Sequence, residues 1–257
     1  MLTQLPILTC LLFASLYPLS FWISARDPLK QNFHHFHIGA AAVAAGLTVF
    51  GFEILNYPPA IRYLGFFWFI LLLGIAFFYW KHETVNPFAA SVPAVFGLGV
   101  VYQMEKMWLG ENGLFFLTTV LGGLIFCAAF FAMNLGHWYL NVHGLPIAHL
   151  NRAVSVLGGC LFIRALADVY FIFAQKLLYD GELISIFQFM LQFDGFFLWI
   201  ALFFGTLFPL ISLYFAKGAL DVKNTQATTG ILYAILCSVL IGDLTYKYYL
   251  IKFGVAL

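Results

Sequence analysis

The chain has 257 residues, of which 63% are hydrophobic and only 9% are charged. Soluble domains usually carry about 25% charged residues, so a chain this poor in charge predicts a lipid bilayer, not water, as its main solvent. The formal net charge of +1 provides no basic patch, and we therefore expect no nucleic-acid partner.

Apolar runs long enough to cross a bilayer follow one another along the whole chain. A spanning helix needs about 20 mainly apolar residues. A membrane β-barrel would instead show strands of about 10 residues with alternating polarity, whereas these runs are apolar throughout. We predict an all-α, polytopic transmembrane helical bundle of about eight spanning helices with short loops. The expected spans lie near 5–24, 37–56, 60–80, 88–108, 114–136, 153–175, 190–215 and 227–251.

Turn-forming and charged residues separate these runs, as in the segments 56–59 and 179–182. Because no polar stretch is long enough for a soluble domain, we expect residues 1–257 to form a single integral membrane domain. The apolar run over 183–216 is long for one span, which predicts an interfacial piece or a kink at Pro209. The N-terminus lacks a basic segment, so the first run is expected to be a retained helix and not a cleaved signal peptide. Short loops are typical of a bacterial inner (cytoplasmic) membrane protein.

Eight spans would place both chain ends on one face of the membrane. The loops after the first, third, fifth and seventh spans hold more Lys and Arg than the others, and the positive-inside rule therefore predicts that they lie in the cytoplasm. All seven histidines are expected on or near that face. The carboxylates within the spans are expected toward the other half of the membrane.

The histidines allow three interpretations. Neutral imidazole is a common haem ligand, and His37 and His137 are the best-placed pair for a haem b site. A divalent metal site could instead draw on the other histidines near the same face. The third interpretation is that these histidines bind lipid headgroups or a partner subunit. The candidate metal ligands besides His37 are His34, His35, His143 and His149.

Charged residues inside the predicted spans form the second candidate site. A charge at membrane depth costs roughly 2.5–3.5 kcal/mol on insertion scales and marks a functional site by default. Two pairs have the four-residue spacing that places side chains on one helix face, and they could equally be structural pairs that lock helices together. Two further carboxylates, Glu53 and Glu105, could simply reach the headgroups. The candidate proton path or intramembrane ion pairs comprise Glu53, Glu105, Arg164, Asp168, Asp194, Asp243 and Lys247.

Three functional hypotheses remain open at this stage. The first is an integral membrane subunit of an energy-coupling complex for electron and proton transfer, which would work with other membrane protein subunits and bind haem b or a quinone. The second is a proton-coupled transporter or channel, and the third is a non-catalytic membrane scaffold or assembly subunit. Aromatic residues near span ends, such as Tyr246, fit an interfacial aromatic belt, with a pocket for a quinone or another flat apolar ligand as the alternative. The motifs of nucleotide-binding loops and of serine hydrolases are absent from the sequence, so a hydrolase is not expected.

Overall fold

A computed structural model of the chain describes residues 3–25, 29, 33–142 and 144–257. Among these residues, eight helical segments are long and apolar enough to cross a membrane. The predicted all-α bundle of about eight spans is thereby confirmed, and the chain is a multi-pass integral membrane protein. The spans are Gln4–Ser24, Phe33–Ile54, Pro59–Tyr79, Pro87–Leu109, Gly113–Asn141, Ala148–Ala174, Leu198–Asp221 and Thr225–Phe253.

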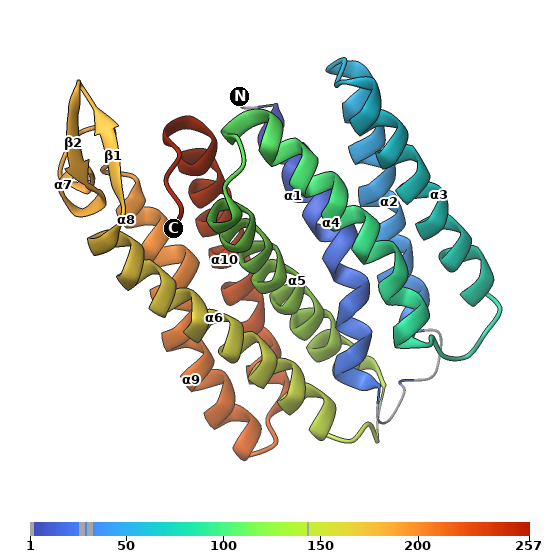
Figure 1. Ribbon diagram of the computed structural model, residues 1–257. Helices are drawn as coiled ribbons and strands as arrows, with labels where there is room; N and C mark the ends of the chain where they lie inside the picture. The colour runs from blue at the N-terminus through green and yellow to red at the C-terminus, as the bar shows by residue number, and fades with distance from the viewer. Residues whose placement is uncertain (1–2, 26–28, 30–32, 143) are drawn as a thin grey trace. The chain divides into compact units, whose positions relative to one another are not determined.

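The structure divides into two compact units, Met1–Asn112 and Gly113–Leu257. Each unit contains four of the spans, and the expectation of one domain over the whole chain stays a prediction. Within each unit, successive spans run antiparallel because the loops between them are short (Figure 1).

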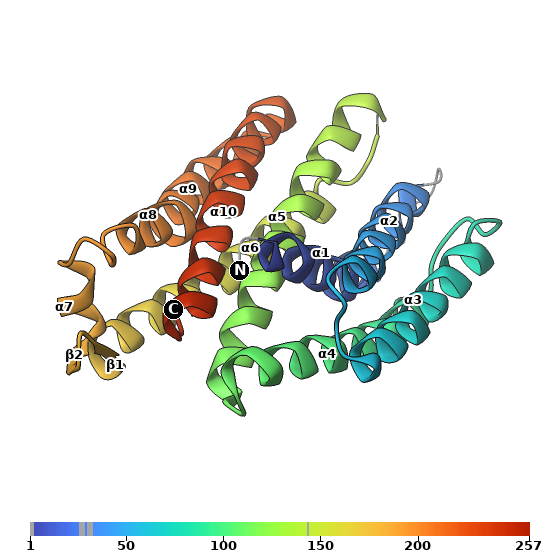
Figure 2. The ribbon, with the colours of Figure 1, turned by 90° about the horizontal axis from the view of Figure 1, so that it is seen from above.

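The first unit is a ring of four spans (Figure 2). Helix α1 packs against α2 and α4, and α3 packs against the same two helices. Large apolar side chains such as Trp68 and Phe52 are fully buried between them. The elements are α1 (Gln4–Leu16), the 3-10 helix η1 (Tyr17–Ser24) that continues it, α2 (Phe33–Ile54), α3 (Pro59–Tyr79) and α4 (Pro87–Leu109).

The second unit is also a ring of four spans. Helix α10 packs against α5 and α9, and α6 packs against the same two helices. The elements are α5 (Gly113–Asn141), α6 (Ala148–Ala174), β1 (Lys176–Tyr179), β2 (Glu182–Ser185), α7 (Ile186–Met190), α8 (Leu198–Leu202), the π-helix η2 (Phe203–Leu207), α9 (Phe208–Asp221) and α10 (Thr225–Phe253). The segments α8, η2 and α9 are continuous and together make one span.

Local sequence signals determine where several helices begin and end. Helix α4 begins with Pro87, and the side chain of Asn86 accepts a hydrogen bond from the Phe88 amide at 2.9 Å. Helix α10 has the same kind of cap, because the Asn224 side chain accepts from the Ala227 amide at 2.9 Å. It ends at Gly254, whose φ of 65° is the left-handed conformation that commonly closes a helix.

The long apolar run over 183–216 resolves into two parts. Its first part lies outside the span, in strand β2, which pairs antiparallel with β1, in the short helix α7 and in the turns that follow α7. The hairpin turn uses Asp180 and Gly181, whose φ values of 49° and 85° suit a two-residue Asp-Gly turn. The second part contains the π-helix η2, which ends just before Pro209. Proline removes an amide donor and crowds the carbonyl four residues earlier, and a local π segment is one way in which a membrane helix accommodates this.

Candidate functional site

The centre of the second unit contains an ion pair on one face of α6. Arg164 Nε lies 3.3 Å from an Asp168 carboxylate oxygen, and the two side chains are only 2% and 4% exposed. The four-residue spacing predicted that these two side chains share a helix face, and the structure brings them together. Both charges are removed from solvent within a membrane span, where an unpaired charge is strongly unfavourable.

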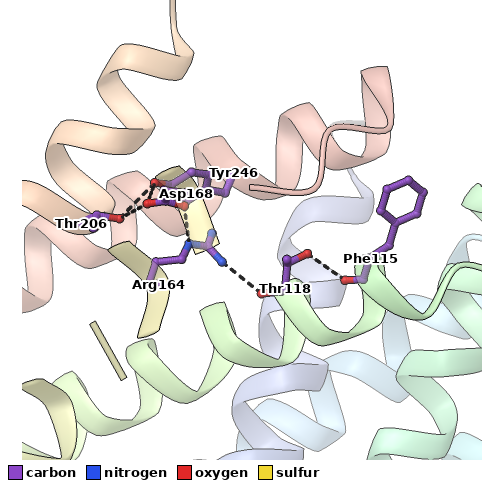
Figure 3. Close-up of polar contacts among 6 residues, drawn as sticks. All are labelled: Phe115, Thr118, Arg164, Asp168, Thr206 and Tyr246. Carbon is purple, nitrogen blue, oxygen red and sulfur yellow. Dashed lines mark hydrogen bonds and ion pairs between the residues drawn. The ribbon is translucent and has the colours of Figure 1, made fainter. Parts of the chain in front are cut away.

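Hydroxyl groups from two other spans complete the surroundings of Asp168 (Figure 3). Thr206 of η2 donates to the carboxylate at 2.6 Å, and Tyr246 of α10 donates to the same oxygen at 2.8 Å. These two hydroxyls also lie 3.1 Å from each other. The carboxylate thus receives two hydroxyl donors on one oxygen and a guanidinium beside the other.

Arg164 has partners of its own besides Asp168. It donates to the backbone carbonyl of Thr118 on α5 at 3.2 Å, and its guanidinium carbon lies 3.9 Å from the centre of the Tyr246 ring. This distance suits a cation–π interaction. The Arg164–Asp168 pair therefore links all four spans of the second unit.

A second buried ion pair lies on α10. Lys247 donates to the carboxylate of Asp243, and both side chains are almost completely buried. The spacing predicted this pair as well. Asp243 fits against α5 because a glycine faces it: a Cβ added at Gly122 would lie only 2.6 Å from an Asp243 carboxylate oxygen.

A small cavity connects the two ion pairs. Its walls include Arg164 of the first pair and Asp243 of the second, together with Tyr246. Its volume is about 10 Å³, which is close to the smallest space that holds one water. Water at this position would lie beside one residue of each pair, Arg164 and Asp243.

The π-helix η2 positions Thr206 toward Asp168. Its neighbour Gly205 touches Gly242 of α10 so closely that a Cβ on Gly242 would lie 2.1 Å from the Gly205 Cα. Ser238 of α10 donates to the carbonyl of Phe204 at 2.6 Å, which satisfies a backbone group in the irregular turn. Single π turns inside α-helices occur frequently at functional sites.

The other predicted carboxylates lie outside this cluster. Glu53 is exposed and forms an ion pair with Arg62 at 2.8 Å, which fits the interpretation that it reaches the headgroups. Glu105 is buried on α4 in the first unit. Its sequence neighbour Lys106 pairs instead with Glu111, and this ion pair lowers the pKa of Glu111.

The expectation that Asp194 lies within a span is wrong. The seventh span begins at Leu198, so Asp194 belongs to the exposed turns before it. There it accepts a hydrogen bond from the Tyr179 hydroxyl at 3.0 Å, and this bond raises the pKa of Tyr179. The physical reason is that the turns from 191 to 197 are rich in phenylalanine, so hydropathy alone does not separate them from the span.

The histidines of the first unit gather at one end of α2 and α3. The imidazole of His37 is buried and hydrogen-bonds the Tyr17 hydroxyl. His34 Nε2 lies 3.0 Å from the Tyr79 carbonyl, and the His35 ring stacks on Trp80 with 4.6 Å between ring centres.

The remaining candidate histidines belong to the second unit or fall outside the described residues. His137 Nδ1 lies 3.3 Å from the Tyr233 hydroxyl, and His149 Nδ1 lies 3.2 Å from an Arg152 nitrogen. His143 is outside the described residues. Among the residues that are described, no three His, Cys, Asp or Glu side chains gather closely enough to hold a metal ion. Because His37 and His137 belong to different units, the haem b site stays a prediction.

The sequence did not point to Thr206 or Tyr246 as members of the charged cluster. Tyr246 was expected in an aromatic belt, but its side chain is buried against Arg164. Its position between Asp243 and Lys247 is the one signal that could have suggested an interior location. As assembled, the cluster offers two carboxylates, two hydroxyls and space for one water, which are groups that can hold and pass protons.

Comparisons with protein-family models, with curated proteins and with solved structures found no match to this chain.

Proposed function

We propose that this chain is an integral membrane subunit of an energy-coupling complex and that its second unit transfers protons. The observation that carries the proposal is the pair of buried ion pairs on either side of a water-sized cavity, Arg164–Asp168 and Asp243–Lys247. Ionisable residues inside membrane spans commonly form the proton relays of pumps and transporters.

The contacts suggest an order for the transfer. Asp168 takes up a proton through the Tyr246 hydroxyl, which gives its own proton to the carboxylate while it receives another from a water and so stays neutral. Thr206 holds the carboxylate in place through its own hydrogen bond. Tyr246 also borders the small cavity, and Asp243 lies on the wall of the same cavity. A water there would lie beside Asp243 and Tyr246, and the Tyr246 hydroxyl completes the link to Asp168.

The wider setting is part of the proposal. The complex would lie in a bacterial inner membrane, with other membrane protein subunits beside this chain. Electron transfer through haem b or through a quinone would then drive the proton movement. A proton-coupled transporter or channel is the second candidate, and the same buried cluster supports it.

The test is proton flux in proteoliposomes that contain a pH-sensitive dye and the full chain, together with the subunits that co-purify with it. The variants are Asp168→Asn and Asp243→Asn, with Glu53→Gln as the control because that carboxylate is exposed and outside the cluster. We expect the two cluster variants to lose most of the flux and the control to keep it. Full flux in both cluster variants would refute the proposal.

A second measurement separates the two candidates. Flux carried by the purified chain alone supports the transporter or channel. Flux that requires co-purified subunits, with a haem absorption band in the same preparation, supports the energy-coupling complex. Because Asp168→Asn leaves Arg164 without its partner, an Arg164→Gln/Asp168→Asn variant that folds normally serves as the companion, and it should also lack flux.

A further inference from the structure

A larger pocket lies between two spans of the second unit, on the other side of Asp168. One wall is α6 and the other is formed by α8 and η2. Its volume is about 440 Å³, within the range of about 300–1,000 Å³ typical of small-molecule sites. Both walls belong to membrane spans, so the pocket lies within the bilayer.

The pocket is open on the outer surface of these spans. Val169, Phe203 and Leu207 on its walls are 59%, 46% and 52% exposed. Nearly all of its lining surface is carbon. Apolar surface at this depth favours an apolar occupant, and the bilayer supplies hydrocarbon in excess.

Two polar residues, Asp168 and Thr206, border the pocket. The Thr206 hydroxyl is already donated to Asp168, and both side chains are buried. They therefore present almost no polar surface to an occupant, which argues against a ligand that binds mainly through hydrogen bonds. An apolar occupant of the pocket would nevertheless pack directly against Asp168 and Thr206, which form the wall of the charged cluster.

We propose that this pocket binds a hydrocarbon chain from the membrane, either the acyl chain of a phospholipid or the isoprenoid tail of a lipid quinone. The two sources share the same chemistry at the pocket wall. A bound chain would exclude water from this side of Asp168. Binding itself does not depend on proton transfer, so the two proposals can fail separately.

Trp199 provides the readout. It lies on the pocket wall, and its indole nitrogen donates to the Met190 carbonyl at 3.2 Å, which holds the ring in place. The Trp199 emission is obtained as the difference between the wild-type chain and Trp199→Phe. Brominated acyl chains quench it in one arm, and a lipid quinone added to an unbrominated bilayer quenches it in the other.

Val169→Phe fills the pocket, and Val156→Phe is the matched control on the same helix, because Val156 is also exposed but lies outside the pocket lining. We expect saturable quenching at low quencher fraction in the wild type and in Val156→Phe. In Val169→Phe, quenching should rise only in proportion to the bulk quencher fraction. The arm that saturates identifies the source of the chain. Proportional quenching of the wild type in both arms, or identical quenching of the two Phe variants, would overturn the proposal.

Discussion

Removing the Arg164 side chain is the sharpest test of what stabilises the second unit. In Arg164→Met, the ion pair to Asp168, the hydrogen bond to the Thr118 carbonyl and the contact with the Tyr246 ring all disappear. Asp168 keeps its two hydroxyl donors but loses the guanidinium beside its other oxygen. Breaking a buried ion pair by removing one partner costs about 3–5 kcal/mol, and we expect a loss of unfolding free energy in this range.

The double variant Arg164→Met/Asp168→Leu separates pair energy from charge burial. It removes both charges, and the hydroxyls of Thr206 and Tyr246, 3.1 Å apart, can still bond to each other. Replacing both partners of a buried pair by apolar residues is often neutral or stabilising, so the double variant should be more stable than Arg164→Met.

The assay is unfolding of the purified chain in mild detergent by titration with a denaturing detergent. Arg62→Met is the control, because its ion pair with Glu53 is exposed and such pairs contribute about 0–1 kcal/mol. Asp168→Leu is measured as the second single variant. If the double variant lost as much unfolding free energy as the two single variants together, the two charges would not be coupled and the reasoning would fail.

Two further outcomes follow from local packing and burial. Gly242→Ala should destabilise the chain by about 1–3 kcal/mol, because its Cβ would overlap the Gly205 backbone. Gly230→Ala on the same helix is the control, since a Cβ there meets open space and should not destabilise the chain. Equal thermal unfolding of the two variants would contradict this packing. Burial raises the pKa of Tyr57 to about 12, above its usual value of about 10, so its contribution to stability is complete below about pH 10 and is lost as the pH rises toward 12. Tyrosinate absorbance of the wild type minus that of Tyr57→Phe should titrate near pH 12, and a midpoint near 10 would show that this side chain is solvated.

Much of the fold followed from the sequence because a bilayer imposes a strict requirement. Each span needs about 20 apolar residues in a row, so the runs alone located the helices to within several residues. The ion pairs Arg164–Asp168 and Asp243–Lys247 were also predictable, because residues four apart share a helix face.

The partners of these pairs were not predictable, for a physical reason. Thr206 reaches Asp168 because η2 is a π turn packed against α10 through Gly205 and Gly242. This contact depends on the rotation and the depth in the membrane of two helices far apart in sequence. The hydropathy pattern gives no information on either quantity. Tyr246 resembles a belt residue in composition, and only the packing of the four spans shows that it points inward.

The boundary of the seventh span was misplaced for a different reason. Phenylalanines continue the apolar run through the turns before Leu198, so Asp194 seemed to lie within the span. The Asp180-Gly181 turn was a usable signal, since Asp-Gly between two apolar runs is a strong indicator of a hairpin.

The two buried ion pairs of the second unit carry no net charge together. Arg164 and Lys247 cancel Asp168 and Asp243, so the interior is electrically neutral when all four are ionised. One additional proton leaves this cluster with an uncompensated positive charge in a medium of low dielectric constant, and a second arrival would meet strong Coulomb repulsion. If the second unit transfers protons as proposed, the cluster should therefore hold one extra proton at a time, and each proton should leave before the next one enters.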